Sequence, residues 1–289
     1  MTPSYGVPDT TMIKIINFIE KDLNLNYKLR PHWRCEYHPL YASCDALRFE
    51  SLTQALMSNH KVIWAARGGS GMTSLMPRLK SWMTTLVSPP SYKLLIGFSD
   101  ITALHLLLHQ EWGWPTLHGP TLACLTKDFL DETSIESLKK FLSDTAPEIY
   151  EENLRPLNDA ACQESLIEGS LIGGNHSLVQ YSLGTWWQLN SHNKILFLED
   201  VNEVAYRIDA RLQHLDQAGL FQGIKALILG DFNHRTSSIP EEIFKTDYVL
   251  QTFAKKLSIP VFKMLGYGHT SQNKPLILGF VVAKVRNAP

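Results

Sequence analysis

One segment, residues 93–110 with the sequence KLLIGFSDITALHLLLHQ, constrains the fold more than any other part of the chain. An apolar run at 94–96 meets Gly97, and a helical pattern of leucines begins soon after Ser99 and Asp100. A strand, a sharp turn and a helix can lift one hydroxyl out of a sheet, as in a nucleophile elbow, although the second glycine of G-x-S-x-G is absent. The same residues also suit a simple helix N-cap, and the segment alone favours that cap.

Helix and strand patterns alternate along the rest of the chain. Apolar residues at helical spacing predict helices at 11–23 (with Asp9 as its cap), 49–56, 73–80, 204–218 and 241–257. Short apolar runs predict strands at 62–66, 114–118, 194–198, 226–229, 260–264 and 276–285, and residues 171–184 read as a turn followed by a helix. Such alternation is typical of α/β proteins with a doubly wound, mostly parallel sheet, in which ligands bind at the carboxyl ends of strands.

The alternation of helix and strand patterns is lost in the middle of the chain. Residues 146–168 are polar and contain two prolines, which favours an interdomain connection. The sequence therefore predicts an N-terminal domain at 1–145, a linker at 146–168 and a C-terminal domain at 169–289.

The composition is that of a compact globular protein. Of 289 residues, 44% are hydrophobic and 19% are charged, which excludes a disordered chain. A net charge of -1 without a basic cluster gives nucleic-acid binding no electrostatic support. We expect no membrane span and no signal peptide, because no apolar run reaches about 18 residues and the N-terminus lacks the leader pattern. Four scattered cysteines favour reduced thiols in a cytoplasmic protein.

Three residues with complementary chemistry follow strands or turns: Ser99, Glu199 and His269. A serine needs a base to take its proton, and histidine is the usual base near neutral pH. A carboxylate can then fix the imidazole tautomer. Taken singly, His269 reads equally as a loop histidine, and Glu199 as a strand-end carboxylate paired with Arg207 or Arg211.

The segment RGGSG at 67–71 offers backbone N–H groups without bulky side chains. It could form an oxyanion hole or cradle a phosphate, but it also suits a tight turn that needs positive φ. It matches neither the Walker A pattern nor G-x-G-x-x-G. His105 and His109 have the spacing of a metal-chelating pair, but without a carboxylate partner they are better interpreted as helix-surface histidines, so no metal site is predicted.

Taken together, these segments resemble the LD-carboxypeptidase family of serine peptidases, the murein tetrapeptide carboxypeptidases. The matching motifs occur in the family's order, and they are AARGGSG (65–71), LIGFSDITALH (95–105), HGP (118–120), GSLIGGNHSLV (169–179), ILFLEDVNEVAYRIDARLQHL (195–215), ALILGDF (226–232) and GYGHT (266–270). The resemblance covers most of the chain and changes Ser99 from a predicted cap to a predicted nucleophile.

The resemblance implies a catalytic triad of Ser99, Glu199 and His269. It also implies an oxyanion hole of backbone amides, which we place at Gly69 and Asp100, and substrate-binding roles that we place at Arg67, Gly68 and Asn175. The implied fold is an N-terminal flavodoxin- or Rossmann-like parallel-sheet domain with the serine, followed by a β-rich α/β domain with the glutamate and histidine. The active site would lie in the groove between these domains.

The implied activity is hydrolysis of the amide between meso-diaminopimelate and the terminal D-alanine of a murein tetrapeptide, during cytoplasmic cell-wall recycling. The muropeptide is the expected partner, no metal or organic cofactor is expected, and the family implies a homodimer. One alternative is the microcin C immunity branch, which cleaves peptidyl or aminoacyl sulfamoyl-adenylates, although this chain lacks that branch's inserted aromatic loop. Others are a nonenzymatic phosphate- or nucleotide-binding protein and a general α/β-hydrolase.

The sequence departs from the family pattern at two places. Family members commonly have an aromatic residue where this chain has Ser70, so we expect the loop to pack differently over substrate. Members usually begin with an apolar strand that runs into A-P-S, whereas this chain begins at residues 1–4 with MTPS. Either the first strand is missing or translation starts upstream.

Overall fold

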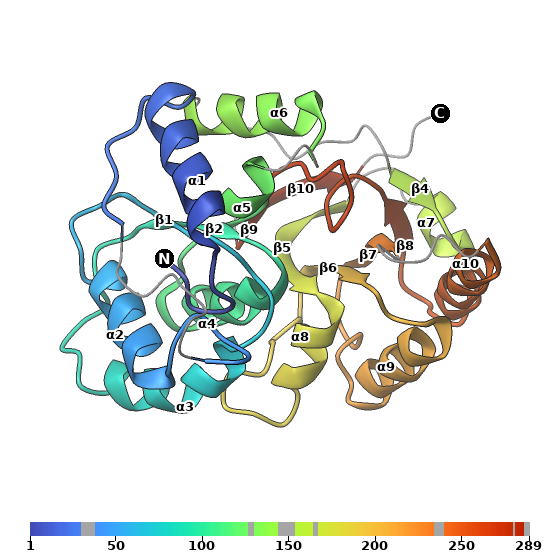
Figure 1. The fold of residues 1–289 in the computed structure, drawn as a ribbon. Helices are drawn as coiled ribbons and strands as arrows, with labels where there is room; N and C mark the ends of the chain where they lie inside the picture. Colours follow the sequence, from blue (N-terminus) through green and yellow to red (C-terminus); the bar gives the residue numbers. More distant parts are fainter. Residues whose placement is uncertain are drawn as a thin grey trace.

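The computed structural model consists of two sheets and the helices on their faces (Figure 1). It describes residues 1–29, 38–126, 130–143, 154–163, 167–233 and 240–279 and the backbone of 281–285. The first sheet has the order β1 (Val62–Trp64), β2 (Leu94–Gly97), β3 (Thr116–His118), β9 (Leu276–Leu278). The second has the order β10 (Val281–Val285), β5 (Ile167–Asn175), β6 (Ile195–Val201), β7 (Ala226–Asn233), β8 (Val261–Met264), β4 (Leu154–Pro156).

Parallel pairing dominates both sheets, and the predicted α/β fold is confirmed. Strands β1, β2 and β3 are mutually parallel, as are β5, β6, β7 and β8. Antiparallel strands stand at the edges: β9 pairs with β3, β10 with β5 and β4 with β8. These strands pair with both outer strands of the second parallel core and with one outer strand, β3, of the first.

Helices cover the sheets in layers (Figure 1). One apolar cluster joins the first sheet to α1 (Asp9–Lys21), α5 (Leu122–Leu125) and α6 (Glu132–Ser143). The opposite face packs on α2 (Asp45–Leu56), α3 (Met72–Met83) and α4 (Thr102–Trp112). The second sheet packs on α8 (His176–Ser182), α9 (Ala205–Gln217) and α10 (Pro240–Ala254), with α7 (Asp159–Gln163) near β4 and β8.

Helix α4 lies beside strands of both sheets (Figure 1). Every residue from Thr102 to Leu108 is buried, and the helix contacts β3, β5 and α8. One continuous core contains Leu95 of β2, Leu107 of α4 and Leu196 of β6. Because each fully buried leucine contributes about 1.5–3 kcal/mol, this shared core binds the two sheets strongly to one another.

Some predicted elements differ from those observed. Asp9 is the first residue of α1 and Pro8 is its N-cap. The predicted turn at 171–175 is the end of strand β5, and the predicted strand 276–285 is two strands that belong to different sheets. Within the predicted linker of 146–168, 146–153 and 164–166 lie outside the described residues, 154–163 holds β4 and α7, and 167–168 begin β5.

No helix in the described ranges is long and apolar enough to cross a membrane.

Candidate active site

Ser99 occupies the sharp turn between β2 and α4. Its φ is +65°, a left-handed value that residues other than glycine seldom adopt. Ser99 is half-buried, whereas Phe98 and Asp100 on either side are buried. Neither Ser99 nor Asp100 provides a side-chain cap for the helical turns that follow. The turn therefore presents the serine in the manner of a nucleophile elbow.

The buried carboxylate of Asp100 fastens this turn to two other segments. It accepts hydrogen bonds from the Ser4 hydroxyl at 2.5 Å and from the Met72 backbone N–H, at the start of α3, at 2.9 Å. Burial raises the pKa of Asp100, while the Ser4 and Met72 hydrogen bonds and the charge of Arg48 oppose the rise. The turn is thereby tied both to the N-terminal segment and to the end of the glycine-rich loop.

The RGGSG loop packs directly against Ser99. A Cβ added to Gly68 would lie 2.9 Å from the Ser99 Cβ, so the loop backbone reaches the serine only because no side chain intervenes. Gly69 has φ +115°, and the Tyr5 ring fills the space that a Cβ would need. The guanidinium of Arg67 lies 5.3 Å from the centre of the same Tyr5 ring. An aromatic ring thus packs on the loop, although residue 70 itself is serine.

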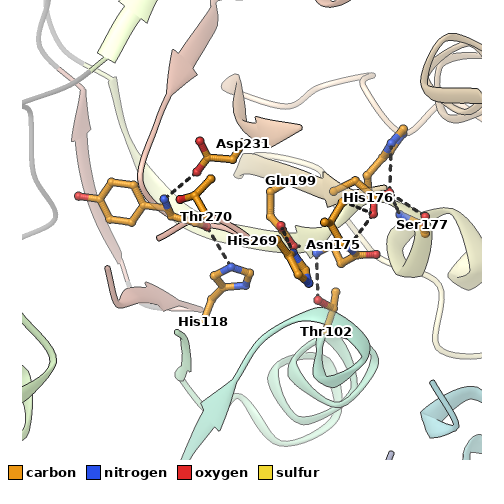
Figure 2. A network of polar contacts seen from close by, with 12 residues as sticks. Thr102, His118, Asn175, His176, Ser177, Glu199, Asp231, His269 and Thr270 are labelled. Carbon is orange, nitrogen blue, oxygen red and sulfur yellow. Dashed lines mark hydrogen bonds and ion pairs between the residues drawn. The ribbon is translucent and has the colours of Figure 1, made fainter. Parts of the chain in front are cut away.

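Glu199 and His269 form a buried pair (Figure 2). The Nδ1–H of His269, in the turn after β8, donates to Glu199 Oε2 at 2.6 Å. Glu199 is fully buried in β6 and His269 is 6% exposed. Burial raises the pKa of Glu199, and the His269 charge and hydrogen bond oppose that rise. The predicted alternative for Glu199 is not observed, because Arg211 pairs instead with Asp200 at 3.5 Å.

The two turns that carry Ser99 and His269 are in contact through Phe98. The ring of Phe98, adjacent to Ser99, lies 4.5 Å from the imidazole of His269, centroid to centroid. The N-terminal sheet therefore brings its serine turn to the pair that the second sheet supplies.

Asp231 is a buried carboxylate near the candidate site that the sequence reasoning missed. The β6–β7 register shifts between Leu198 and Asp200, and such a bulge re-aims side chains. Asp231 in β7 accepts hydrogen bonds from the backbone N–H groups of Gly266 at 2.9 Å and Tyr267 at 3.1 Å (Figure 2). It thereby shapes the turn that presents His269, and its place in the ALILGDF motif was the available signal.

Asn175, predicted to bind substrate, is buried among protein partners. It lies beside Glu199 in the β5–β6 register. Its side-chain amide donates to Asp200 Oδ1 at 2.9 Å and, at 3.5 Å, to Glu199 Oε1. Its backbone N–H donates to the Thr102 hydroxyl at 2.9 Å (Figure 2). Asn175 therefore contacts the carboxylate of the pair directly.

The interpretation of His105 as a surface histidine is wrong. His105 is 1% exposed, because α4 is buried on every side along its first two turns, and its Nε2 lies 2.8 Å from the Gly97 carbonyl. Among the described residues no group of three or more histidine, cysteine or carboxylate side chains could hold a metal ion. A separate apolar pocket between α1 and β1, lined by Ile15, Ile19 and Trp64, contains none of the predicted site residues.

A half-buried serine at a strained strand–helix turn, next to a phenylalanine whose ring contacts a buried imidazole–carboxylate pair, is the arrangement expected of a serine hydrolase. Residues 1–119 match the LD-carboxypeptidase N-terminal domain and residues 168–283 match the LD-carboxypeptidase C-terminal domain. The chain belongs to the LD-carboxypeptidase family.

Individual relatives agree with this assignment. A Rickettsia conorii protein that bears the provisional name of a carboxypeptidase is 40% identical over 278 residues, which cover 96% of this chain and 84% of the relative. The crystal structure of muramoyltetrapeptide carboxypeptidase from Oxalobacter formigenes is 25% identical, with a TM-score of 0.79 over 100% of this chain and 94% of that one. A microcin C7 self-immunity protein, solved with adenosine monophosphate, shares the fold at 20% identity and a TM-score of 0.76, over 97% of this chain and 90% of that one.

Proposed function

We propose that this protein is a serine LD-carboxypeptidase that hydrolyses the amide between meso-diaminopimelate and the terminal D-alanine of murein tetrapeptides. The observation that carries the proposal is the 2.6 Å contact of His269 with the buried Glu199, in a chain of this family whose Phe98, next to the strained Ser99, has its ring against His269. The similarity to muramoyltetrapeptide carboxypeptidase supports the choice of substrate.

In the proposed mechanism the Ser99 hydroxyl attacks the scissile carbonyl while His269 Nε2 takes its proton. Glu199 holds the proton on Nδ1 and stabilises the imidazolium that forms. The backbone amides of Gly69 and Asp100 stabilise the oxyanion. His269 then protonates the amine of the departing D-alanine, which leaves an acyl-enzyme at Ser99. Water, deprotonated by His269, releases the tripeptide and regenerates the serine.

The remaining predicted residues have distinct roles in this proposal. Arg67 is half-buried, its guanidinium donates to the Gly6 carbonyl at 3.2 Å, and it adjoins the loop that touches Ser99, so we assign it to a substrate carboxylate. Gly68 gives the substrate close access to the loop backbone. Asn175 acts through Glu199, because its amide is committed to Glu199 and Asp200. The chemistry needs no metal or organic cofactor, and we place it in cytoplasmic cell-wall recycling by a homodimer.

The test is incubation of the protein with L-Ala-D-Glu-meso-diaminopimelate-D-Ala, with tripeptide and free D-alanine followed by mass spectrometry. Ser99→Ala should keep the fold and lower turnover by about 10⁴–10⁶-fold, because the nucleophile is lost. Ser88→Ala is the matched control, since Ser88 is exposed and outside the site.

Wild-type-like release by Ser99→Ala would refute the triad. Cleavage of aminoacyl sulfamoyl-adenylates, but not of the tetrapeptide, would replace the proposed substrate with that of the microcin immunity branch, whose fold this chain shares. Nucleotide binding that Ser99→Ala leaves unchanged, without any hydrolysis, would indicate a nonenzymatic binding protein.

A further inference from the structure

Two buried histidines that the proposed mechanism does not use lie beneath the candidate site. His105 comes from α4 and is 1% exposed, and His118 comes from β3 and is fully buried. Their ring centres are 6.4 Å apart. Burial of a polar imidazole costs hydration free energy unless hydrogen bonds compensate for it. Each of these histidines therefore needs a structural or functional reason for its position.

Each histidine contacts a carbonyl two residues before a proposed catalytic residue. His105 Nε2 lies 2.8 Å from the carbonyl of Gly97, and Gly97 precedes Ser99 by two positions. His118 Nε2 lies 3.1 Å from the carbonyl of Tyr267, which precedes His269 by two positions (Figure 2). The two rings thus contact equivalent points on the two turns.

These contacts fix the protonation of both rings. A carbonyl only accepts, so in each histidine the proton is on Nε2 and the ring donates it. The Nδ1 atoms of both residues have no hydrogen-bond partner among the described residues, which suits the bare nitrogen of a neutral ring. Burial lowers the pKa of His105 to about 4 and that of His118 to about 3, so neither ring is charged near neutral pH.

Aromatic contacts connect His118 to the candidate site. The Phe98 ring lies 6.0 Å from His118 and 4.5 Å from His269, centroid to centroid. The Phe197 ring also lies 5.4 Å from His118, centroid to centroid. Packed rings therefore connect the two turns, and close packing leaves little space for either to move.

We propose that His105 and His118 are positioning residues that hold the turns of Ser99 and His269 at their working separation. His118 is the stronger case, because it extends from the first sheet to a turn that the second sheet supplies. Asp231 holds the same turn from β7 through the N–H groups of Gly266 and Tyr267, so His118 and Asp231 fix it from two directions. The proposal rests on the proposed function, in which Ser99 and His269 react together.

The test compares His118→Leu with His118→Gln. Leucine removes the donor, whereas the glutamine amide places an N–H near the position of the imidazole Nε2–H. His118→Leu should lower kcat for D-alanine release by about 10²-fold with KM unchanged, because a displacement of about 1 Å costs that much. His118→Gln should restore most of kcat. The exposed His60→Leu is the matched control.

Two further measurements separate this proposal from the proposed function. The rate at which a fluorophosphonate labels Ser99 should fall in His118→Leu and recover in His118→Gln, and it needs no peptide. The downfield NMR signal of the proton between His269 and Glu199 should shift in His118→Leu but not in His118→Gln. This measurement does not depend on substrate turnover. Release of no D-alanine by wild-type protein would defeat the proposed function only. The positioning role would be overturned if His118→Leu matched the wild type in kcat, labelling rate and proton signal. It would also be overturned if His118→Leu and His118→Gln lost kcat and labelling rate equally.

Discussion

Ser99 combines backbone strain with partial exposure. A non-glycine residue at φ +65° costs about 1–3 kcal/mol, and such a conformation persists only where surrounding contacts enforce it. Here those contacts come from its neighbours, since Asp100 is tied to Ser4 and Met72 and Phe98 packs on His269. The strained residue is thus the one that the proposed reaction needs to present.

His176 gives the folded protein a defined sensitivity to acid. It is fully buried, and burial lowers its pKa to about 4, with Arg211 adding to the effect and Asp200, 4.0 Å away, opposing it. A histidine with a depressed folded-state pKa stabilises the fold fully above its unfolded pKa of about 6.5, and this stability is lost as the pH falls towards 4. Below pH 6.5 the unfolded chain therefore binds a proton that the folded chain does not.

We therefore expect His176→Leu to flatten the pH dependence of stability. Between pH 6.5 and 5 the wild-type free energy of unfolding should fall by about 2 kcal/mol relative to the variant. Urea unfolding of both proteins at pH 7.5, 6.5 and 5 measures this difference. Parallel pH curves for the two proteins would show that His176 does not titrate as its burial requires.

At the scale of elements, the backbone of the glycine-rich loop packs closely against Ser99. The Gly68 Cα is near enough to Ser99 that an added methyl group would lie 2.9 Å from the Ser99 Cβ and 3.2 Å from its Oγ. Unlike Gly69, Gly68 is not in the positive-φ region, so a substitution there changes packing more than backbone conformation.

Gly68→Ala should therefore displace Ser99 and lower kcat/KM by about 10²-fold, at a cost of about 1–3 kcal/mol in stability. Gly119→Ala is the control, because its added Cβ would make only an ordinary contact, 3.4 Å from Pro275. The test is to measure kcat/KM and urea unfolding for both variants and the wild type. Full activity in Gly68→Ala would mean that the loop does not touch the reacting serine.

Individual elements show where sequence reasoning succeeds and fails. Helices α1 and α9 follow clear amphipathic patterns and were predicted to within a few residues. Helix α4 is apolar on all sides, so periodicity could not show that His105 points into the core. Gly173 read as a turn, yet it lies inside β5, where a Cβ would fall 2.0 Å from the Phe197 carbonyl oxygen. Glycine occurs both in turns and at close backbone contacts, and only the three-dimensional structure distinguishes the two.

The candidate site itself was partly readable from sequence. Ser99, Glu199 and His269 follow or end apolar strands, and strand ends meet at one edge of a parallel sheet. The contact of Glu199 with His269 joins positions 70 apart, which no local pattern encodes. Asp231 and His118 were missed as site residues, because their role depends on a register shift and on the return of β9 to the first sheet.

At the scale of the whole molecule, a few polar contacts reinforce the shared core between the sheets. The buried Thr102 hydroxyl, at the start of α4, accepts the backbone N–H of Asn175 at the end of β5. This hydrogen bond joins the element after Ser99 to the strand beside Glu199.

Thr102→Val should lower the free energy of unfolding by about 1–3 kcal/mol, because it leaves a buried N–H unsatisfied while nearly preserving volume. Thr246→Val is the matched control: Thr246 is also buried in a helix, but its hydroxyl has no partner among the described residues, so its loss should be neutral or stabilising. Chemical denaturation of both variants provides the test. Similar losses in the two would show that the Thr102 hydrogen bond contributes nothing specific.

The pairing of β9 with β3 also dictates the order of events during synthesis. Strand β3 ends at His118, but its partner β9 begins at Leu276, after the four parallel strands of the second sheet. A nascent polypeptide on the ribosome can therefore assemble β1, β2 and β3, yet the outer side of β3 stays unpaired until β9 emerges, after all the strands of the second parallel core. His269 emerges just before β9, so the segment that supplies the proposed base and the segment that closes the sheet leave the ribosome together. Hydrolytic competence would then require this one long-range closure, which follows the synthesis of both parallel cores.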